Sequence, residues 1–250
     1  SGLCCAAAEN PRVVVLVANN LSIRDLAEPG FSHLSSLLAE GSSGLMNVRT
    51  GRGGRYLDPT YPSGMEAACV SLGAGAMAVG GAEVRRAGEA ESLINGMLIS
   101  RIYECRMGAC ADAASILHTE AARISRTNSE ASYRAEPGAL GEALHASGIR
   151  TAVLGNSDLP NEIHGEVVAF AMDKKGRVDF GCTNSALFLR ADTQAPFGCS
   201  VDNGRLLESA RLALQQARFV VVDYGDTFRA DLYAEHCTDE QAALNRHRAL

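Results

Sequence analysis

The sequence predicts an α/β fold, a three-layer sandwich with a central, mostly parallel sheet and a β-hairpin insertion. Helical segments alternate with short, continuous apolar runs, which is typical of a parallel sheet covered on both faces. Three of the apolar runs end in polar clusters, and open α/β sheets bind their ligands at the carboxyl ends of their strands. The clusters are Asn19-Asn20, 155–158 and 223–226. We therefore expect these residues to converge, together with Ser71, on one edge of the sheet.

Size and charge exclude several classes of protein. At 250 residues, with 46% hydrophobic and 21% charged residues, the composition is that of a globular protein with a sizeable core. The net charge of -6 and the lack of a sustained basic run argue against a nucleic-acid partner. No apolar run reaches the roughly 20 residues needed to cross a bilayer, so no transmembrane segment is expected. We expect a disordered leader or signal-peptide remnant at 1–11 and a single domain at 12–250.

The first unit is a strand followed by a helix. The apolar run 13–18 ends at Asn19. Ser22, with an aspartate three residues later, is typical of a helix start, and apolar residues then keep helical spacing until Gly41. A short strand is expected at 45–50, followed by a glycine-rich loop.

The stretch 66–78 is central to the functional interpretation. Ser71 lies between an apolar approach and the small residues 73–76. Small residues allow a backbone to come close to a ligand, and a helix that began here would direct free amides at an anion. This arrangement suits a nucleophilic or anion-binding hydroxyl at the tip of a strand. The alternative is a tightly packed strand-to-helix turn without chemistry.

The middle of the chain contains the second α/β unit. Helical composition extends over 111–124, and the polar stretch 127–137 predicts a loop. A helix is expected over 140–147, ended by Gly148, and the apolar run 150–154 predicts the next strand.

The last third predicts a hairpin and a third unit. The runs 167–172 and 177–180 flank a turn with a glycine, which indicates a β-hairpin. Asp202 is a candidate cap for a helix that precedes the strand 219–222. Thr238, with a glutamine three residues later, predicts the start of a final helix that reaches the end of the chain without a stop signal. We therefore expect the domain to be truncated at its C-terminus.

The eight cysteines do not form a metal-binding pattern. The sequence contains no C-x-x-C pair and its six histidines are scattered, so a structural zinc site is not expected. A disulfide between Cys105 and Cys110 is a candidate if the compartment is oxidising.

The glycines after Ser71 also allow a dinucleotide-binding interpretation. Gly73-Ala-Gly75-Ala-Met-Ala78 matches the G-x-G-x-x-A fingerprint. That motif should follow the first strand of a βαβ unit, with an acidic residue about 20 positions later at the end of a second strand. Here it follows the third segment, and the acids Glu89 and Glu91 lie in a polar stretch. A dinucleotide-binding oxidoreductase is therefore the lowest-ranked hypothesis.

The residues alone leave the chemistry of Ser71 open. It is not in a G-x-S-x-G turn, and no histidine is placed by sequence to act as its base. A divalent metal would instead lower the pKa of the hydroxyl, and Asp223 and Asp226 are suitable hard ligands. The alternative for each of these aspartates is a structural role, in which its side chain stabilises a turn or caps a helix.

Five segments together resemble the alkaline phosphatase superfamily, which includes phosphatases, sulfatases and cofactor-independent phosphoglycerate mutases. More closely, the chain looks like an envelope-associated bacterial branch of it. The segments are 13–22, 44–50, 71–75, 151–156 and 220–226.

The resemblance implies roles for five residues. Ser71 would be the nucleophile that takes up a phosphoryl or sulfuryl group. Asn19 and Asp226 would hold metal, and Asn156 would lie on the substrate side. Arg49 would neutralise the anionic substrate, although a solvated surface arginine is its alternative.

The departures from the family pattern support a second hypothesis. Asn19 stands where an aspartate is expected, and a neutral amide is a poorer ligand for a divalent cation. Ala230 stands where a histidine is expected, and the late Asp-His segment does not occur before Leu250.

Two hypotheses about the function therefore rank highest. The first is a metal-assisted phosphoryl or sulfuryl ester hydrolase or transferase that uses zinc, manganese or magnesium and acts on a small anionic ester. The second is a catalytically degenerate homologue without metal that binds a ligand or an envelope partner. For both, the resemblance implies an extracytoplasmic or membrane-associated full-length protein.

Overall fold

The computed structural model describes residues 11–22, 25, 32–42, 44, 50, 64–111 and 114–250. The predicted leader up to residue 10, most of the predicted strand 45–50, the glycine-rich loop and Arg49 lie outside the described residues.

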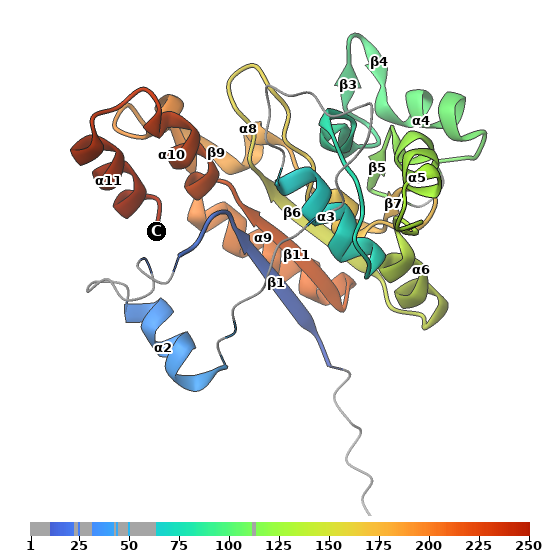
Figure 1. Ribbon diagram of the computed structural model, residues 1–250, viewed down its shortest axis with the longest axis horizontal. Coiled ribbons are helices and arrows are strands. Elements are labelled where there is room, and N and C mark those ends of the chain that lie inside the picture. Colours follow the sequence, from blue (N-terminus) through green and yellow to red (C-terminus); the bar gives the residue numbers. More distant parts are fainter. Residues whose placement is uncertain are drawn as a thin grey trace, which may run out of the picture.

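The centre of the molecule is a four-stranded parallel sheet with the strand order β1-β11-β6-β8 (Figure 1). Its strands are β1 (Val13–Ala18), β6 (Thr151–Asn156), β8 (Phe180–Cys182) and β11 (Phe219–Tyr224). The predicted α/β class with a central parallel sheet is thereby confirmed. Three of its strands are the apolar runs predicted from the sequence.

Helices cover both faces of this sheet (Figure 1). Val221 of β11 belongs to the core shared with helices α3 (Met65–Ala74) and α7 (Val168–Ala171). Its neighbour Val222 points the opposite way, into the core shared with helix α9 (Asn203–Gln216). Because side chains alternate along a strand, odd-numbered residues of β11 face α3 and even-numbered residues face α9.

The remaining elements surround this sandwich. A second sheet is antiparallel, with the order β2-β5-β7, and there are two short antiparallel pairs, β3-β4 and β9-β10. These strands are β2 (Ala87–Glu89), β3 (Leu93–Ile94), β4 (Met97–Leu98), β5 (Ile116–His118), β7 (Arg177–Val178), β9 (Leu189–Ala191) and β10 (Cys199–Val201). The other helices within the described residues are α2 (Ser32–Glu40), α4 (Ile99–Met107), α5 (Ala121–Glu130), α6 (Ala139–Ala146), α8 (Ser185–Phe188), α10 (Asp226–Ala234), α11 (Asp239–Arg248) and the 3-10 turns η1 (Ala82–Arg85) and η2 (Pro196–Gly198).

The helix caps predicted at Asp202 and Thr238 are present, and the side-chain bonds expected at Ser22 are formed, although most residues of the helix predicted to follow Ser22 up to Ser32 lie outside the described part of the chain. Ser22 and Asp25 bond reciprocally: the Ser22 amide donates to Asp25 Oδ2 at 2.7 Å, and the Asp25 amide donates to Ser22 Oγ at 3.3 Å. Asp202 accepts from the Arg205 amide at the start of α9. Thr238 accepts from the amide three residues on at the start of α11. That last helix ends at Arg248, so the expectation that it continues to the end of the chain is wrong.

Two predicted elements are corrected. The run 167–172 is not a hairpin strand, because it forms the short helix α7, and 177–178 pairs with β5 instead. All six residues of the run are buried, and a continuous apolar run of this length fits a buried helix as well as a buried strand. Within 111–124, the fully buried Ile116 and Leu117 lie in β5, and the helix there is α5, which continues to Glu130.

The Cys105 thiol is free, so the candidate Cys105–Cys110 disulfide is not formed. No described helix is long and apolar enough to cross a membrane.

Candidate functional site

Three strands of the sheet end at one edge. The register pairs Ala18 with Tyr224 and Tyr224 with Asn156, so the polar clusters that follow β1, β11 and β6 are neighbours. The predicted convergence of the three polar clusters is confirmed, but the printed hydrogen bonds of the Ser71 hydroxyl run to Ala67 and Ala78 and not to these clusters. The convergence follows from the parallel order alone, because parallel neighbours end at the same side of a sheet.

The sequence predicted that a helix begins at Ser71. This prediction is wrong, because Ser71 lies in the last turn of α3. Its Oγ donates to the Ala67 carbonyl at 2.7 Å and accepts from the Ala78 amide at 2.9 Å. The hydroxyl therefore closes the loop that leaves the helix. The free amides of α3 lie at its other end, where the first helical residue is Met65, so they are not directed at Ser71.

The glycines after Ser71 end the helix rather than begin one. Gly75 is the C-cap of α3, with a φ of 62° that favours glycine. Gly73 allows α7 to pack closely, since a Cβ there would lie 2.3 Å from the Ala169 carbonyl oxygen. The strand-to-helix turn that a dinucleotide fingerprint requires is therefore absent at these glycines, and that hypothesis loses its structural basis.

Asp226 stabilises the junction between β11 and α10. Its carboxylate accepts from the Val201 amide at 3.0 and 3.1 Å and from Arg229 at 2.9 Å. Arg229 is fully buried and also donates to the Asp158 carbonyl. A cavity of about 200 Å³ lies beside Asp226, but the carboxylate is already bonded to protein donors.

Asn156 is also engaged by the protein. Its Nδ2 donates to the Thr183 carbonyl at 2.7 Å, and its Oδ1 accepts from the Asp158 amide at 3.1 Å. The side chain therefore joins the end of β6 to the end of β8 instead of pointing to a substrate.

The structure adds a buried chain of charges that the sequence did not reveal. Glu66 of α3 accepts from Arg85 Nε at 2.7 Å, and Arg85 also pairs with Glu162. Glu162 lies 3.7 Å from His164 Nε2, and His164 Nδ1 lies 2.9 Å from Glu166. His164 and Glu166 are each 1% exposed. The only sequence signal for this row of buried charges is the His-x-Glu pair directly before the apolar run 167–172.

Asp223 is the carboxylate of this region on β11. It is 1% exposed and accepts two bonds from Ser157 Oγ, at 2.9 and 3.0 Å. Burial, followed by the negative charge of Glu166, raises the pKa of Asp223 to about 7. The same carboxylates act on the buried Cys69 of α3. The pKa of its thiol is raised by burial and then by the negative charges of Glu166, Asp223 and Glu66. The buried carboxylates Glu66, Glu166 and Asp223 thus all act on Cys69, and Glu166 acts on Asp223, at the α3 face of this edge.

Three buried polar atoms have no hydrogen-bond partner in the described part of the chain: Asn19 Nδ2, His164 Nε2 and Glu166 Oε2. Buried polar atoms almost always have a partner, so such atoms point to a missing one. Burial would lower the pKa of His164, but the bond to Glu166 and its charge outweigh burial and raise it. His164 Nε2 is therefore a hydrogen-bond donor over a wider pH range, as Asn19 Nδ2 always is.

These residues do not fit the expected metal site. Among the residues that the structure describes, no three His, Cys, Asp or Glu side chains are grouped so as to hold a metal ion. The Asn19 side chain is a neutral amide, which is a poorer ligand for a divalent cation than a carboxylate, and the Asp226 carboxylate is paired with Arg229.

No family model, curated protein or solved structure matches this chain.

Proposed function

We propose that this chain is a ligand-binding α/β domain, similar to the alkaline phosphatase superfamily, that does not hydrolyse esters. The observation that carries the proposal is that Asn19 Nδ2, His164 Nε2 and Glu166 Oε2 are buried at the carboxyl edge of the sheet without a hydrogen bond from the described residues, His164 Nε2 having only the Glu162 carboxylate at 3.7 Å. A bound molecule would supply the missing partners. The groups expected to do chemistry are engaged in holding the fold, since the Ser71 hydroxyl closes the end of α3 and Asp226 binds Arg229.

The chemistry of the three atoms defines the class of ligand. Asn19 Nδ2 and the protonated His164 Nε2 donate, which suits the oxygens of an anion. Glu166 Oε2 accepts, which suits a hydroxyl group. A small phosphate ester that carries hydroxyl groups satisfies both requirements. Glycerol 3-phosphate is the simplest probe of this kind.

The test is the melting temperature with and without glycerol 3-phosphate. A ligand at 100 times its dissociation constant stabilises the native state by about 2.7 kcal/mol, which shifts the melt. We expect a shift in the wild type and a loss of most of it in Asn19→Asp, because the substitution replaces a donor by a negative charge. Asn95→Asp adds the same charge on an exposed turn and controls for net charge.

Asn19→Asp also separates the binding proposal from the hydrolase hypothesis. If a latent metal site needed only its first carboxylate, the variant would gain turnover of 4-nitrophenyl phosphate with zinc, manganese or magnesium. The proposal predicts no gain. No melting shift in the wild type, or a metal-dependent gain of turnover in the variant, would overturn it.

Ser71→Ala tests the structural role of the predicted nucleophile. Loss of the bonds to Ala67 and Ala78 leaves the Ala78 amide without its partner, which costs about 1–3 kcal/mol of unfolding free energy. Urea denaturation measures this cost. We expect Ser71→Ala to retain the glycerol 3-phosphate shift at a temperature where the variant is folded, whereas a binding or reacting hydroxyl would lose it.

A further inference from the structure

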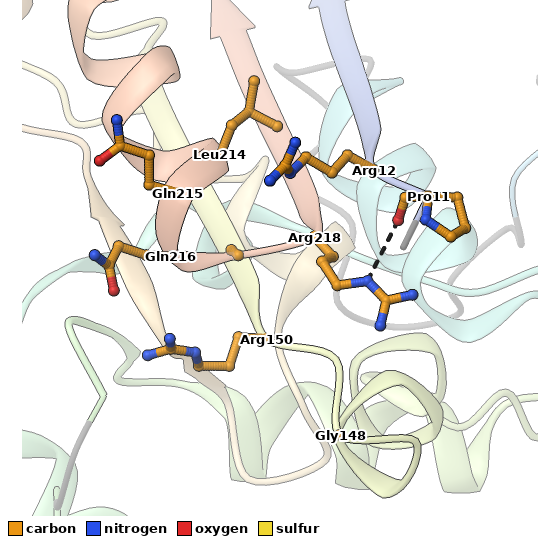
Figure 2. Close-up of a pocket in the computed structure, with 9 residues that line it drawn as sticks. Pro11, Arg12, Gly148, Arg150, Leu214, Gln215, Gln216 and Arg218 are labelled. Atoms are coloured by element: carbon orange, nitrogen blue, oxygen red, sulfur yellow. Dashed lines mark hydrogen bonds between the residues drawn. The ribbon is translucent and has the colours of Figure 1, made fainter. Parts of the chain in front are cut away.

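We infer that the opposite edge of the sheet carries a binding site for a polyanion, formed by Arg12, Arg150 and Arg218. These residues directly precede β1, β6 and β11. They line a cavity of about 720 Å³ at the amino ends of the strands (Figure 2). The site goes beyond the proposed function, because it lies at the other end of the strands from Asn19, His164 and Glu166.

The parallel register sets the three arginines side by side. Val13 pairs with Phe219, and Phe219 pairs with Thr151, so the preceding arginines occupy equivalent positions. Backbone bonds join them: the Arg218 amide donates to the Arg150 carbonyl at 3.2 Å, and the Val13 amide donates to the Arg218 carbonyl at 2.8 Å. Adjacent strands lie about 4.8 Å apart, so the row spans about 10 Å at the backbone.

The three side chains also share one face of the sheet. Val220 and Val222 face α9, and side chains alternate, so Arg218 faces α9 as well. The same alternation applies to Arg150 before β6. Figure 2 shows Arg12 directed toward the last turn of α9, Arg150 below Gln216, and Arg218 turned toward the Pro11 carbonyl.

Within the described part of the chain, the positive charge of this cavity is not balanced. No described acidic residue lines the cavity, and no described carboxylate forms an ion pair with any of the three arginines. The only side-chain bond from the three guanidinium groups to the described chain runs from Arg218 Nε to the Pro11 carbonyl at 3.3 Å. The carboxyl end of α9 offers about half a negative charge, which is small against three positive ones.

Charge and geometry together define the ligand. Guanidinium groups bind phosphate oxygens in bidentate fashion, and a row of three such groups suits a chain of phosphates rather than a single one. The whole protein has a net charge of -6, so a polyanion would be repelled except at a local positive site. The ligand class is therefore an oligophosphate, either free or as the phosphate chain of a larger molecule.

The test is a calorimetric titration with inorganic tripolyphosphate at constant ionic strength. We expect saturable binding of one tripolyphosphate per chain, at least tenfold tighter than that of orthophosphate. Each of Arg12→Gln and Arg150→Gln should weaken it at least tenfold. Both side chains are exposed and without described partners, so the variants should melt like the wild type. Arg126→Gln removes an exposed charge on α5 and should bind normally.

Two results would overturn the inference. One is an absence of saturable binding by the wild type. The other is equal weakening by Arg126→Gln, which would mean that only net charge matters. Titration with ATP distinguishes a free oligophosphate from the phosphate chain of a nucleotide: tighter binding than tripolyphosphate assigns the site to a nucleotide, and weaker binding assigns it to the free chain. Since Arg150→Gln should leave the glycerol 3-phosphate melting shift intact, failure of one site does not imply failure of the other.

Discussion

Replacement of Asp223 by asparagine should stabilise the protein in a pH-dependent way. Asp223 is buried, and its pKa is raised from 3.8 to about 7 in the folded state. Between these two values the folded protein holds a proton that the unfolded chain has lost, so the stability of the wild type falls as the pH rises. Above pH 7 both states are ionised and the loss is complete. Asparagine mimics the neutral acid, still accepts from Ser157 and has no such dependence.

The magnitude follows from the shift. One pKa unit corresponds to about 1.4 kcal/mol, so the two units between pH 5 and pH 7 amount to about 3 kcal/mol. The difference in unfolding free energy between Asp223→Asn and the wild type should grow by this order from pH 5 to pH 8, in favour of the variant. Urea denaturation at several pH values, followed by far-ultraviolet circular dichroism, measures it.

Two controls make the result specific. Glu91→Gln removes an exposed carboxylate and accounts for the change in net charge. Glu166→Gln removes the neighbouring negative charge that contributes to the shift, so in that background the pH dependence should move to lower pH. A constant difference between Asp223→Asn and the wild type from pH 5 to pH 8 would refute the reasoning, because it would mean that Asp223 titrates alike in both states.

Further predictions concern packing and buried charge. Gly73→Ala should cost at least about 2 kcal/mol, because its Cβ would meet the Ala169 carbonyl, whereas Gly64→Ala, whose Cβ meets nothing within 4 Å, should be nearly neutral in thermal melts. Arg85→Met should cost about 3–5 kcal/mol, since it leaves Glu66 buried without its partner. The double variant with Glu66→Gln should recover much of that loss in urea denaturation, and no recovery would contradict the assigned pair.

The sequence predicts those parts of the fold that depend on local pattern. The apolar runs at 13–18 and 219–222 indicated two strands of the sheet, and Asp202 and Thr238 indicated helix starts. Each of these features depends on residues within one turn or one strand, which is the range over which propensity and capping act.

Predictions failed where one pattern fits two structures. The small residues after Ser71 fit the start of a helix, but Gly75 adopts a left-handed conformation that ends one. The apolar run 167–172 has no period that separates strand from helix, and in the structure it forms a helix that packs closely against Gly73.

Sequence patterns could not predict the buried site, because its side chains contact residues that are far apart in the sequence. Glu66 and Arg85 are 19 positions apart, and Ser157 and Asp223 are 66 positions apart. Their burial and pairing are set by the packing of α3 and the loop after β6 on the same face of the sheet. Polar strand ends indicated the correct edge of the sheet, but not which residues there lack a partner.

The most direct test of ligand binding without turnover is a single experiment on the wild-type protein with glycerol 3-phosphate and zinc, manganese or magnesium. Binding is followed by calorimetry, and released inorganic phosphate is assayed in the same sample. The account predicts saturable binding and no release of phosphate above the protein-free control. Metal-dependent release that disappears in Ser71→Ala would contradict it and would establish Ser71 as a nucleophile.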